Sequence, residues 1–443
     1  MPNSNDTLAL LGGPEAVNLD PGNTFTWPIV TEEDEQAVLS VLRKGTMSEI
    51  DVTMDFEADF AAWQGSRYAL GFNNGTNSLQ AAMFSVGVGV GGEVICPSLT
   101  YWASILPCYS LGATPVFTDI NPETLCMDPR DIEHRITDQT QAIMVVHYVG
   151  HPADMDAMMN IANQHQIPVI EDVSHAQGGL YKGRKTGTFG KVNAMSLMSG
   201  KSLPIGEGGI LVTDDVEMYE RAIAFGHYRR YNDEITSPEL APYRNLPMGG
   251  IKGRMNQLCS AMGCVQLRHY DQRAAEIRQA LNYFWDLLEG TPGLQAHRVP
   301  SGADSNMAGW YSARGLYHPE ELGGLSVTRF AQAVTAEGSV CSPGLNLPLH
   351  LHPLFNQVDV YGHGRPTRIA NSHRDVRQPR GSLPVSESIG ARAYLIPQFK
   401  KYNPEVIEQH AAAYRKAANH YQDLRDGDPG NPPGLTDWAC NVS

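Results

Sequence analysis

Apolar and polar positions follow two alternating patterns in the first half of the chain. Short apolar runs such as 93–97 (EVICP) and 167–173 (IPVIEDV) lack the two-residue alternation of a half-exposed strand, so they predict strands covered on both faces. Between such runs, segments 76–86, 102–111 and 154–165 place apolar residues at helical spacing. Strands that alternate with helices predict a parallel sheet joined by right-handed crossovers.

The pattern changes in the second half of the chain. It predicts one long helix over 254–289, shorter elements around a polar insert at 343–383, and a closing helix over 404–423. We therefore expect an α/β protein of two domains. The expected division is a large α/β domain at 25–255 and a smaller α+β domain at 256–443, joined by the N-terminal segment 1–24.

Composition narrows the range of partners. The 443 residues carry a formal net charge of −15, which argues against a nucleic-acid or anionic-membrane surface. No apolar stretch approaches the ~20 residues of a membrane-spanning helix, and the N-terminus lacks the pattern of a signal peptide. The seven cysteines form no CxxC pair, so we expect reduced thiols and no metal site. These features predict a cytoplasmic protein without a nucleic-acid or membrane partner.

One lysine stands among small and apolar residues in the stretch 196–209 (SLMSGKSLPIGEGG). Lys201 could end a phosphate-binding loop, form a buried ion pair, or act as a nucleophile. The phosphate-binding loop requires a glycine where Met195 stands, so it is disfavoured. The glycines at 87–92 (GVGVGG) resemble a dinucleotide-binding turn, but they follow a predicted helix and precede a strand, the reverse of the required order. We interpret them as a helix stop.

Other candidate residues follow predicted strands, at the edge where open α/β sheets bind ligands. Gly75 permits a tight turn and Thr76 opens a helix, whose N-terminus favours a phosphate. Tyr101 follows the next strand and could stack on a planar ring. Glu171 and Asp172 end a buried strand, where a carboxylate needs a partner such as a cationic ring nitrogen. Each feature alone has an ordinary alternative: a helix cap, a core aromatic residue and a structural ion pair.

Taken together in chain order, these residues predict a pyridoxal phosphate site. The phosphate would lie at the helix start and the ring under Tyr101. Asp172 would keep the ring nitrogen protonated, and Lys201 would be the nucleophile that forms the Schiff base.

Six motifs carry a family resemblance: NNGTNSLQ, EVICPSLTYWAS, GATPVFTDINPETL, VHYVGHPADMDAM, EDVSHAQG and SLMSGKSLPIGEGG. In order and spacing they resemble the DegT/DnrJ/StrS family of fold-type-I, pyridoxal-phosphate-dependent sugar and cyclitol aminotransferases. The match covers about residues 25–290, and GSLPVSE (381–387) extends it. The resemblance implies a large domain with a mostly parallel sheet flanked by helices, and a smaller C-terminal α+β domain.

The resemblance also implies roles for single residues. Lys201 matches the lysine of the internal aldimine, and Asp172 matches the acid beside the pyridine nitrogen. His175 matches a position near the ring hydroxyl, and Tyr101 matches the stacking aromatic residue. The positions that match phosphate-binding residues of the family are Gly75, Thr76 and Ser196.

In this family the neighbouring subunit completes each active site, so the resemblance implies a homodimer. Lys252, in GIKGRM, stands where the family commonly has asparagine, and it could reach a phosphate of the neighbouring site as a point charge. His227, Arg229 and Arg230 could meet an anionic group of a substrate, or form a solvated loop.

The implied reaction is a two-step, ping-pong transfer of an amino group. L-glutamate or L-glutamine donates it through the cofactor, which alternates between pyridoxal and pyridoxamine phosphate, to a ketone of a nucleotide-linked sugar or of a cyclitol. The insert at 343–383 is longer than in many nucleotide-sugar members, which favours a cyclitol. A non-catalytic cofactor-binding regulator and an aminotransferase of broader small ketones or aldehydes remain alternatives. A dehydratase on the same scaffold has histidine in place of this lysine, so the lysine at position 201 disfavours that activity.

Overall fold

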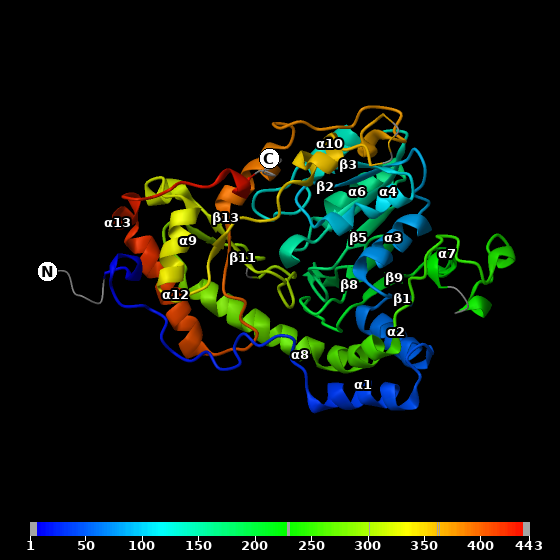
Figure 1. Ribbon diagram of the computed structural model, residues 1–443, viewed down its shortest axis with the longest axis horizontal. Coiled ribbons are helices and arrows are strands. Elements are labelled where there is room, and N and C mark those ends of the chain that lie inside the picture. The colour runs from blue at the N-terminus through cyan, green and yellow to red at the C-terminus, as the bar shows by residue number, and fades with distance from the viewer. Residues whose placement is uncertain (1–6, 228–230, 301, 361, 363, 437–443) are drawn as a thin grey trace.

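A seven-stranded sheet lies at the centre of the larger part of the molecule in the computed structural model (Figure 1). The structure describes residues 7–436 except 228–230, 301, 361 and 363. In spatial order the strands are β1 (Tyr68–Phe72), β9 (Gly209–Thr213), β8 (Val192–Ser196), β5 (Val169–Asp172), β4 (Thr140–Val146), β2 (Glu93–Pro97) and β3 (Thr114–Thr118). Strand β9 runs antiparallel to both of its neighbours, whereas the other pairings are parallel.

Helices cover both faces of this sheet, since alternate residues of a strand point to opposite sides. On β8, Ala194 packs in the apolar cluster that includes α3 (Gly75–Ser85) and α7 (Val216–Gly226). Its neighbour Met195 packs in a different cluster, with α2 (Asp51–Gln64) and the first half of α8 (Gln257–Leu287). Burial on both sides explains why the strands read as nearly continuous apolar runs.

A four-stranded antiparallel sheet forms the smaller part of the molecule, at the left of Figure 1. In spatial order its strands are β10 (Leu294–Ala296), β11 (Arg314–Tyr317), β13 (Ala393–Leu395) and β12 (Ser342–Pro343). Helices α9 (Val327–Ala336) and α12 (Pro404–Asn419) share an apolar cluster with this sheet. Helix α8 connects the two parts, because Tyr270 packs under the large sheet and Phe284 packs in the smaller part.

The remaining α-helices and strands are α1 (Glu32–Lys44), α4 (Pro107–Ser110), α5 (Pro129–Ile132), α6 (Met155–His165), α10 (Pro353–Asn356), α11 (Pro384–Ser388), α13 (Tyr421–Arg425), and the hairpin of β6 (Leu180–Tyr181) and β7 (Arg184–Lys185).

Most predicted elements are present, and two predicted helices differ. The helix expected over 102–111 is a 3₁₀ turn at Trp102–Ser104 followed by α4, because Pro107 cannot donate a backbone hydrogen bond inside a helix. The closing helix breaks at His420, after which α13 continues it. The helix stop predicted at 87–92 is confirmed, since α3 ends at Ser85 and Gly87 has a φ of +90°.

The insert at 343–383 packs against the large sheet. Phe355 belongs to the same apolar cluster as β2 and β3. His350 further joins the insert to the large sheet, because its Nδ1 lies 2.7 Å from Ser98 Oγ and its Nε2 lies 3.0 Å from Glu387 Oε1. These three side chains are buried and line none of the cavities considered below, so we interpret them as a structural link. The packing of this segment thus departs from the expected two-domain division, and the boundary at residue 255 stays a prediction.

The described cysteines are free thiols, and Cys440 lies outside the described residues. Over the same part of the chain, no three His, Cys, Asp or Glu side chains are grouped as a metal site would require. None of the helices that the structure describes combines the length and apolarity needed to cross a membrane.

Candidate active site

A cavity of about 600 Å³ lies beyond the carboxyl ends of the parallel strands. The strand ends and helix starts of the large sheet supply one side of its lining, and the smaller part of the molecule supplies the other. Seven of the residues predicted from the sequence line this cavity: Gly75, Thr76, Tyr101, Asp172, His175, Ser196 and Lys201.

Lys201 lies in a loop between β8 and β9, with 7% of the residue exposed. Its Nζ lies 3.9 Å from the centroid of the Tyr311 ring, and its backbone carbonyl accepts a hydrogen bond of 3.0 Å from Trp27 Nε1. Within the described part of the chain, this amine forms no ion pair with a carboxylate. Burial lowers the pKa of Lys201 to about 8, although the charge of Asp172 opposes the shift. The buried ion pair considered for this lysine is therefore not supported, and the geometry favours a nucleophile.

Asp172 and Glu171 are neighbours on β5 with separate environments, because adjacent strand residues face opposite sides. Asp172 lines the cavity, where its Oδ2 accepts a hydrogen bond of 2.7 Å from Ser104 Oγ and its Oδ1 accepts one of 3.0 Å from the backbone N–H of Ser174. Glu171 instead lies 2.9 Å from His147 Nε2. The structural ion pair thus applies to Glu171, whereas Asp172 is a carboxylate held in place at the cavity.

Helix α3 begins at the cavity. The Asn74 side chain accepts a hydrogen bond of 2.8 Å from the backbone N–H of Asn77, which caps the helix. A Cβ atom on Gly75 would lie 2.6 Å from Ser196 Cβ, so only glycine lets the helix start approach the end of β8 this closely. The first N–H groups of the helix and Ser196 together form a place suited to an anion.

His175 is neutral in this environment. Its Nδ1 accepts a hydrogen bond of 3.2 Å from the backbone N–H of Val149, and its ring stacks on Tyr311 with 4.4 Å between centroids. Burial lowers the pKa of His175 well below its ordinary value, and the positive charges of Lys201 and Arg314 lower it further. His175 therefore offers a neutral imidazole to a ligand.

Tyr101 lies at the rim of the cavity, with 47% of the residue exposed. Its ring is tilted against Trp102, with 4.9 Å between the centroids. An exposed aromatic face at this position is free to stack on a planar ligand.

Several residues of the cavity were not predicted from the sequence. Ser104, which holds Asp172, belongs to the motif around Tyr101, so its position was a usable signal. Tyr311 and Arg314 come from the smaller part of the molecule, where no local motif marks them. The other residues missed in this cavity include Tyr148, Glu207, Ser312 and Asn346.

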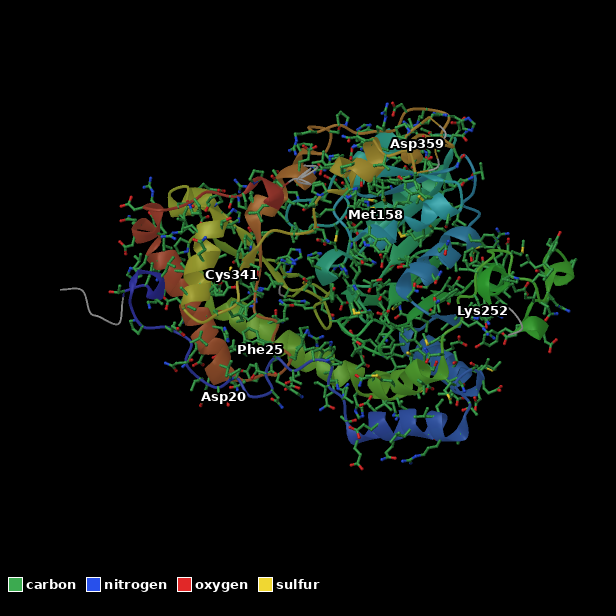
Figure 2. All side chains as sticks on the ribbon, viewed as in Figure 1. Asp20, Phe25, Met158, Lys252, Cys341 and Asp359 are labelled. Atoms are coloured by element: carbon green, nitrogen blue, oxygen red, sulfur yellow. The ribbon has the colours of Figure 1, made fainter. Side chains whose placement is uncertain are left out.

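Four further candidate residues follow α7 in the chain. Lys252 is exposed and does not line the cavity of its own chain, and Figure 2 shows it on the side of the molecule away from the smaller part. His227 is buried, with its ring edge-on to Phe72 at 4.9 Å. Arg229 and Arg230 lie outside the described residues.

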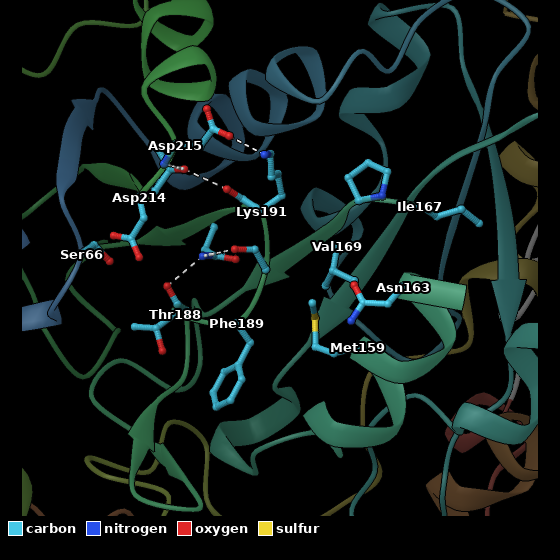
Figure 3. A pocket seen from close by; sticks show the side chains of 15 residues that line it. Ser66, Met159, Asn163, Ile167, Val169, Thr188, Phe189, Lys191, Asp214 and Asp215 are labelled. Carbon is cyan, nitrogen blue, oxygen red and sulfur yellow. Dashed lines mark hydrogen bonds and ion pairs between the residues drawn. The ribbon is translucent and has the colours of Figure 1, made fainter. Parts of the chain in front are cut away.

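A second cavity, of about 490 Å³, lies at the opposite edge of the sheet, where β5 and β8 begin (Figure 3). Its lysine, Lys191, forms an ion pair with Asp215. The amine of Lys191 is thus engaged by a carboxylate, unlike that of Lys201, and the second cavity is not the candidate active site.

The sequence profile described as the DegT/DnrJ/EryC1/StrS aminotransferase family matches residues 28–412. The chain belongs to this family. Its members are pyridoxal-phosphate-dependent transaminases, so the prediction of such an enzyme is confirmed at the level of the family.

Relatives agree with this assignment. The chain is 33% identical over 428 residues to L-glutamine:2-deoxy-scyllo-inosose aminotransferase of Streptoalloteichus tenebrarius, covering 92% of this chain and 98% of the relative. It is 30% identical to dTDP-3-amino-3,4,6-trideoxy-alpha-D-glucose transaminase of Streptomyces venezuelae, covering 82% and 86%. The structure of an aminotransferase from Psychrobacter cryohalolentis superposes with a TM-score of 0.77 at 28% identity, covering 88% of this chain and 97% of that one. The predicted fold class is thereby confirmed.

Proposed function

We propose that this protein transfers the amino group of L-glutamine, or of L-glutamate, to a ketone on a free cyclitol ring. One observation in the site carries the proposal: a buried lysine with a pKa of about 8 and a fixed carboxylate, Asp172, line one cavity. The choice of acceptor and donor is supported by the relative that acts on 2-deoxy-scyllo-inosose with L-glutamine, since the similarity extends over almost the whole of both chains. A nucleotide-linked keto-sugar is the second candidate, supported by the dTDP-sugar transaminase.

The residues of the cavity fit pyridoxal 5'-phosphate. The start of α3, where a Cβ on Gly75 would meet Ser196, suits the phosphate. Asp172 suits a protonated ring nitrogen, Tyr101 a stacked ring face, and Lys201 the carbonyl group. When bound, this cofactor supplies a carbonyl that links to amines and a ring that accepts the electrons released from the α-carbon of the donor.

The chain's own groups would perform the remaining work. The unprotonated Nζ of Lys201 would move the proton of the donor's α-carbon, acting as general base and then as general acid. Two hydrogen bonds hold the carboxylate of Asp172 in one orientation, so it would keep a facing nitrogen protonated. The neutral His175 would donate or accept a hydrogen bond without adding a positive charge. We further propose a cytoplasmic homodimer in which Lys252 of one subunit serves the site of the other.

The experiment that tests the proposal is a visible absorption spectrum of the holoenzyme during addition of L-glutamine. We expect the cofactor band to bleach, and to return when an inosose is added in excess. Lys201→Ala should fold but show no bleaching, since its general base is missing. Asp172→Asn should retain the cofactor, but its cofactor band should bleach at least about 100-fold more slowly than that of the wild type.

The outcomes separate the candidates. Recovery of the band with a dTDP-linked keto-sugar and not with an inosose would favour the second candidate. A wild-type spectrum that neither L-glutamine nor L-glutamate changes would contradict the proposed reaction.

A further inference from the structure

A tryptophan near the N-terminus contacts the loop that carries Lys201. Trp27 lies in the segment before α1, and its Nε1 donates a hydrogen bond of 3.0 Å to the backbone carbonyl of Lys201. The indole also packs against the apolar cluster of the smaller part of the molecule. Trp27 does not line the cavity of the candidate active site. It therefore contacts the reactive lysine through the backbone, from outside the cavity.

The other hydrogen bonds that the structure describes for this loop come from the loop itself and from the large part of the molecule. The backbone N–H of Lys201 donates to the carbonyl of Met198 at 2.8 Å, and Ser202 Oγ donates a hydrogen bond of 2.6 Å to Gln177 Oε1. Trp27 adds the hydrogen bond that joins the loop to the N-terminal segment. A carbonyl away from water is costly to leave unpaired, so the indole N–H favours this one position of the loop.

The segment on both sides of Trp27 is anchored at other places. The carbonyl of Thr24 accepts a hydrogen bond of 2.7 Å from the backbone N–H of Lys400, and the carbonyl of Ile29 accepts one of 3.0 Å from Gln266 Nε2 on α8. These contacts do not involve the Lys201 loop. The indole is thus fixed independently of the loop and can hold the loop in place.

A lysine lies over the ring of Trp27. Lys400 Nζ is 5.0 Å from the ring centroid, within the range of a cation–π interaction. In the described part of the chain this amine forms no ion pair with a carboxylate. Burial lowers the pKa of Lys400 to about 8, so the amine is still mostly protonated at neutral pH. A cation without a counter-charge is attracted to the indole face, which restricts the tilt of the ring and hence the direction of its N–H.

We propose that Trp27 is a positioning residue for Lys201 and that Lys400 fixes its ring. The proposal rests on the proposed function, in which the amine of Lys201 must reach the α-carbon of the donor. The backbone at Lys201 sets that reach, and a displacement of about 1 Å can slow a reaction about 100-fold. Loss of the indole N–H should therefore slow proton transfer without changing how the donor binds, since Trp27 does not line the cavity.

The test follows the bleaching of the cofactor band of the holoenzyme over a range of L-glutamine concentrations, expressed per molecule of bound cofactor. Trp27→Phe keeps an aromatic ring for packing and for Lys400, and it removes the N–H. We expect its maximal rate constant to fall about 10-fold, with the half-saturating concentration of L-glutamine within about twofold of the wild-type value. A variant that is only less stable would contain fewer folded molecules but would keep the wild-type rate constant per bound cofactor.

Two substitutions test the role of Lys400. Lys400→Met keeps most of the side-chain volume and loses the charge, so we expect a maximal rate constant about threefold lower than that of the wild type. Lys400→Arg restores a cation over the ring and should return the rate constant to near the wild-type value. If the two variants reacted at the same rate, the role assigned to Lys400 would be wrong.

The matched control is Trp63→Phe. Trp63 also has a lysine over its ring, with Lys185 Nζ 4.1 Å from the centroid, and its Nε1 donates a hydrogen bond of 2.9 Å to Asp271 Oδ1. It lies on α2 and does not line the cavity of the candidate active site. Trp63→Phe should therefore react with L-glutamine as the wild type does.

Two outcomes would overturn the role of Trp27. The first is a Trp27→Phe holoenzyme with the wild-type rate constant, even if it unfolds at a lower temperature, because Trp27 would then only anchor the segment. The second is an equal loss of rate in Trp27→Phe and Trp63→Phe.

Failure of the proposed transamination would give a different result, since no amino donor would then bleach the wild type. Uptake of pyridoxal 5'-phosphate by the cofactor-free protein tests Trp27 even in that case, because uptake depends on the same amine. Trp27→Phe should slow the uptake about 10-fold relative to the wild type and to Trp63→Phe. Equal rates of uptake in all three proteins would contradict the inference.

Discussion

At the scale of single residues, environment rather than residue type decides which groups are reactive. Glu171 and Asp172 are adjacent carboxylates on β5, yet Glu171 is paired with His147 and receives backbone N–H groups from Gly187 and Gly190. Burial alone would raise the pKa of Glu171, but these hydrogen bonds lower it below the ordinary value. Its partners thus fix Glu171 as a structural anion and leave Asp172 to the cavity.

The lowered pKa of Lys201 predicts how the uptake of pyridoxal 5'-phosphate depends on pH. Burial lowers its pKa to about 8, so half of the amine is unprotonated at that pH and the reactive fraction falls about tenfold for each unit below it. We expect the cofactor-free protein to take up pyridoxal 5'-phosphate at a rate that rises with pH and levels off above about 8. The measurement is the growth of visible absorbance after mixing at a series of pH values. A midpoint near 10.5, the ordinary lysine value, would contradict this environment.

At the scale of elements, the site depends on close contact between the start of α3 and the end of β8. Gly75→Ala places a Cβ 2.6 Å from Ser196 Cβ, which forces the two elements apart. We expect a loss of about 1–3 kcal/mol in stability and a fall in cofactor affinity of about tenfold or more. Denaturant unfolding and titration with pyridoxal 5'-phosphate measure the two effects. Gly89→Ala is the control, since its Cβ would meet no atom closer than 3.9 Å, and equal behaviour of both variants would refute the argument.

The elements also show how far sequence reasoning extends. Strands such as β2 and β5 of the large sheet, and the residues at their carboxyl ends, were predictable, because each strand follows from a local pattern and these ends reach one edge of the sheet. Tyr311 and Arg314 were not, since they reach the cavity through the packing of a separate sheet. The loop before β11 has positive φ at Trp310 and Ser312, which no propensity predicts for these residues. The break at Pro107, by contrast, has a local signal, because a proline cannot continue the hydrogen bonds of a helix interior.

At the scale of the whole molecule, the cavity is lined by both sheets, and α8 is packed against both parts. Lys252 is exposed on the segment that follows α7, away from the cavity of its own chain (Figure 2). A lysine so placed can act in catalysis only on another molecule. The homodimer with shared sites is therefore a prediction about assembly that a mixing experiment can test.

The experiment co-expresses two singly substituted chains, Lys201→Ala and Lys252→Glu. The second substitution reverses the charge that is expected to face a phosphate. Each homodimer should be impaired, the first for lack of its amine and the second through weaker binding of pyridoxal 5'-phosphate. In a hybrid dimer, one site joins Lys201 of one subunit to an intact Lys252 of the partner subunit, and the other site carries both changes. Half of randomly mixed dimers are hybrids with one working site in two, so co-expression should restore about a quarter of the wild-type activity.

If Lys252 served its own subunit, no hybrid would contain an intact site and activity would not return. Size-exclusion chromatography with light scattering establishes in parallel whether a dimer forms, and a monomer with full activity would exclude a shared site.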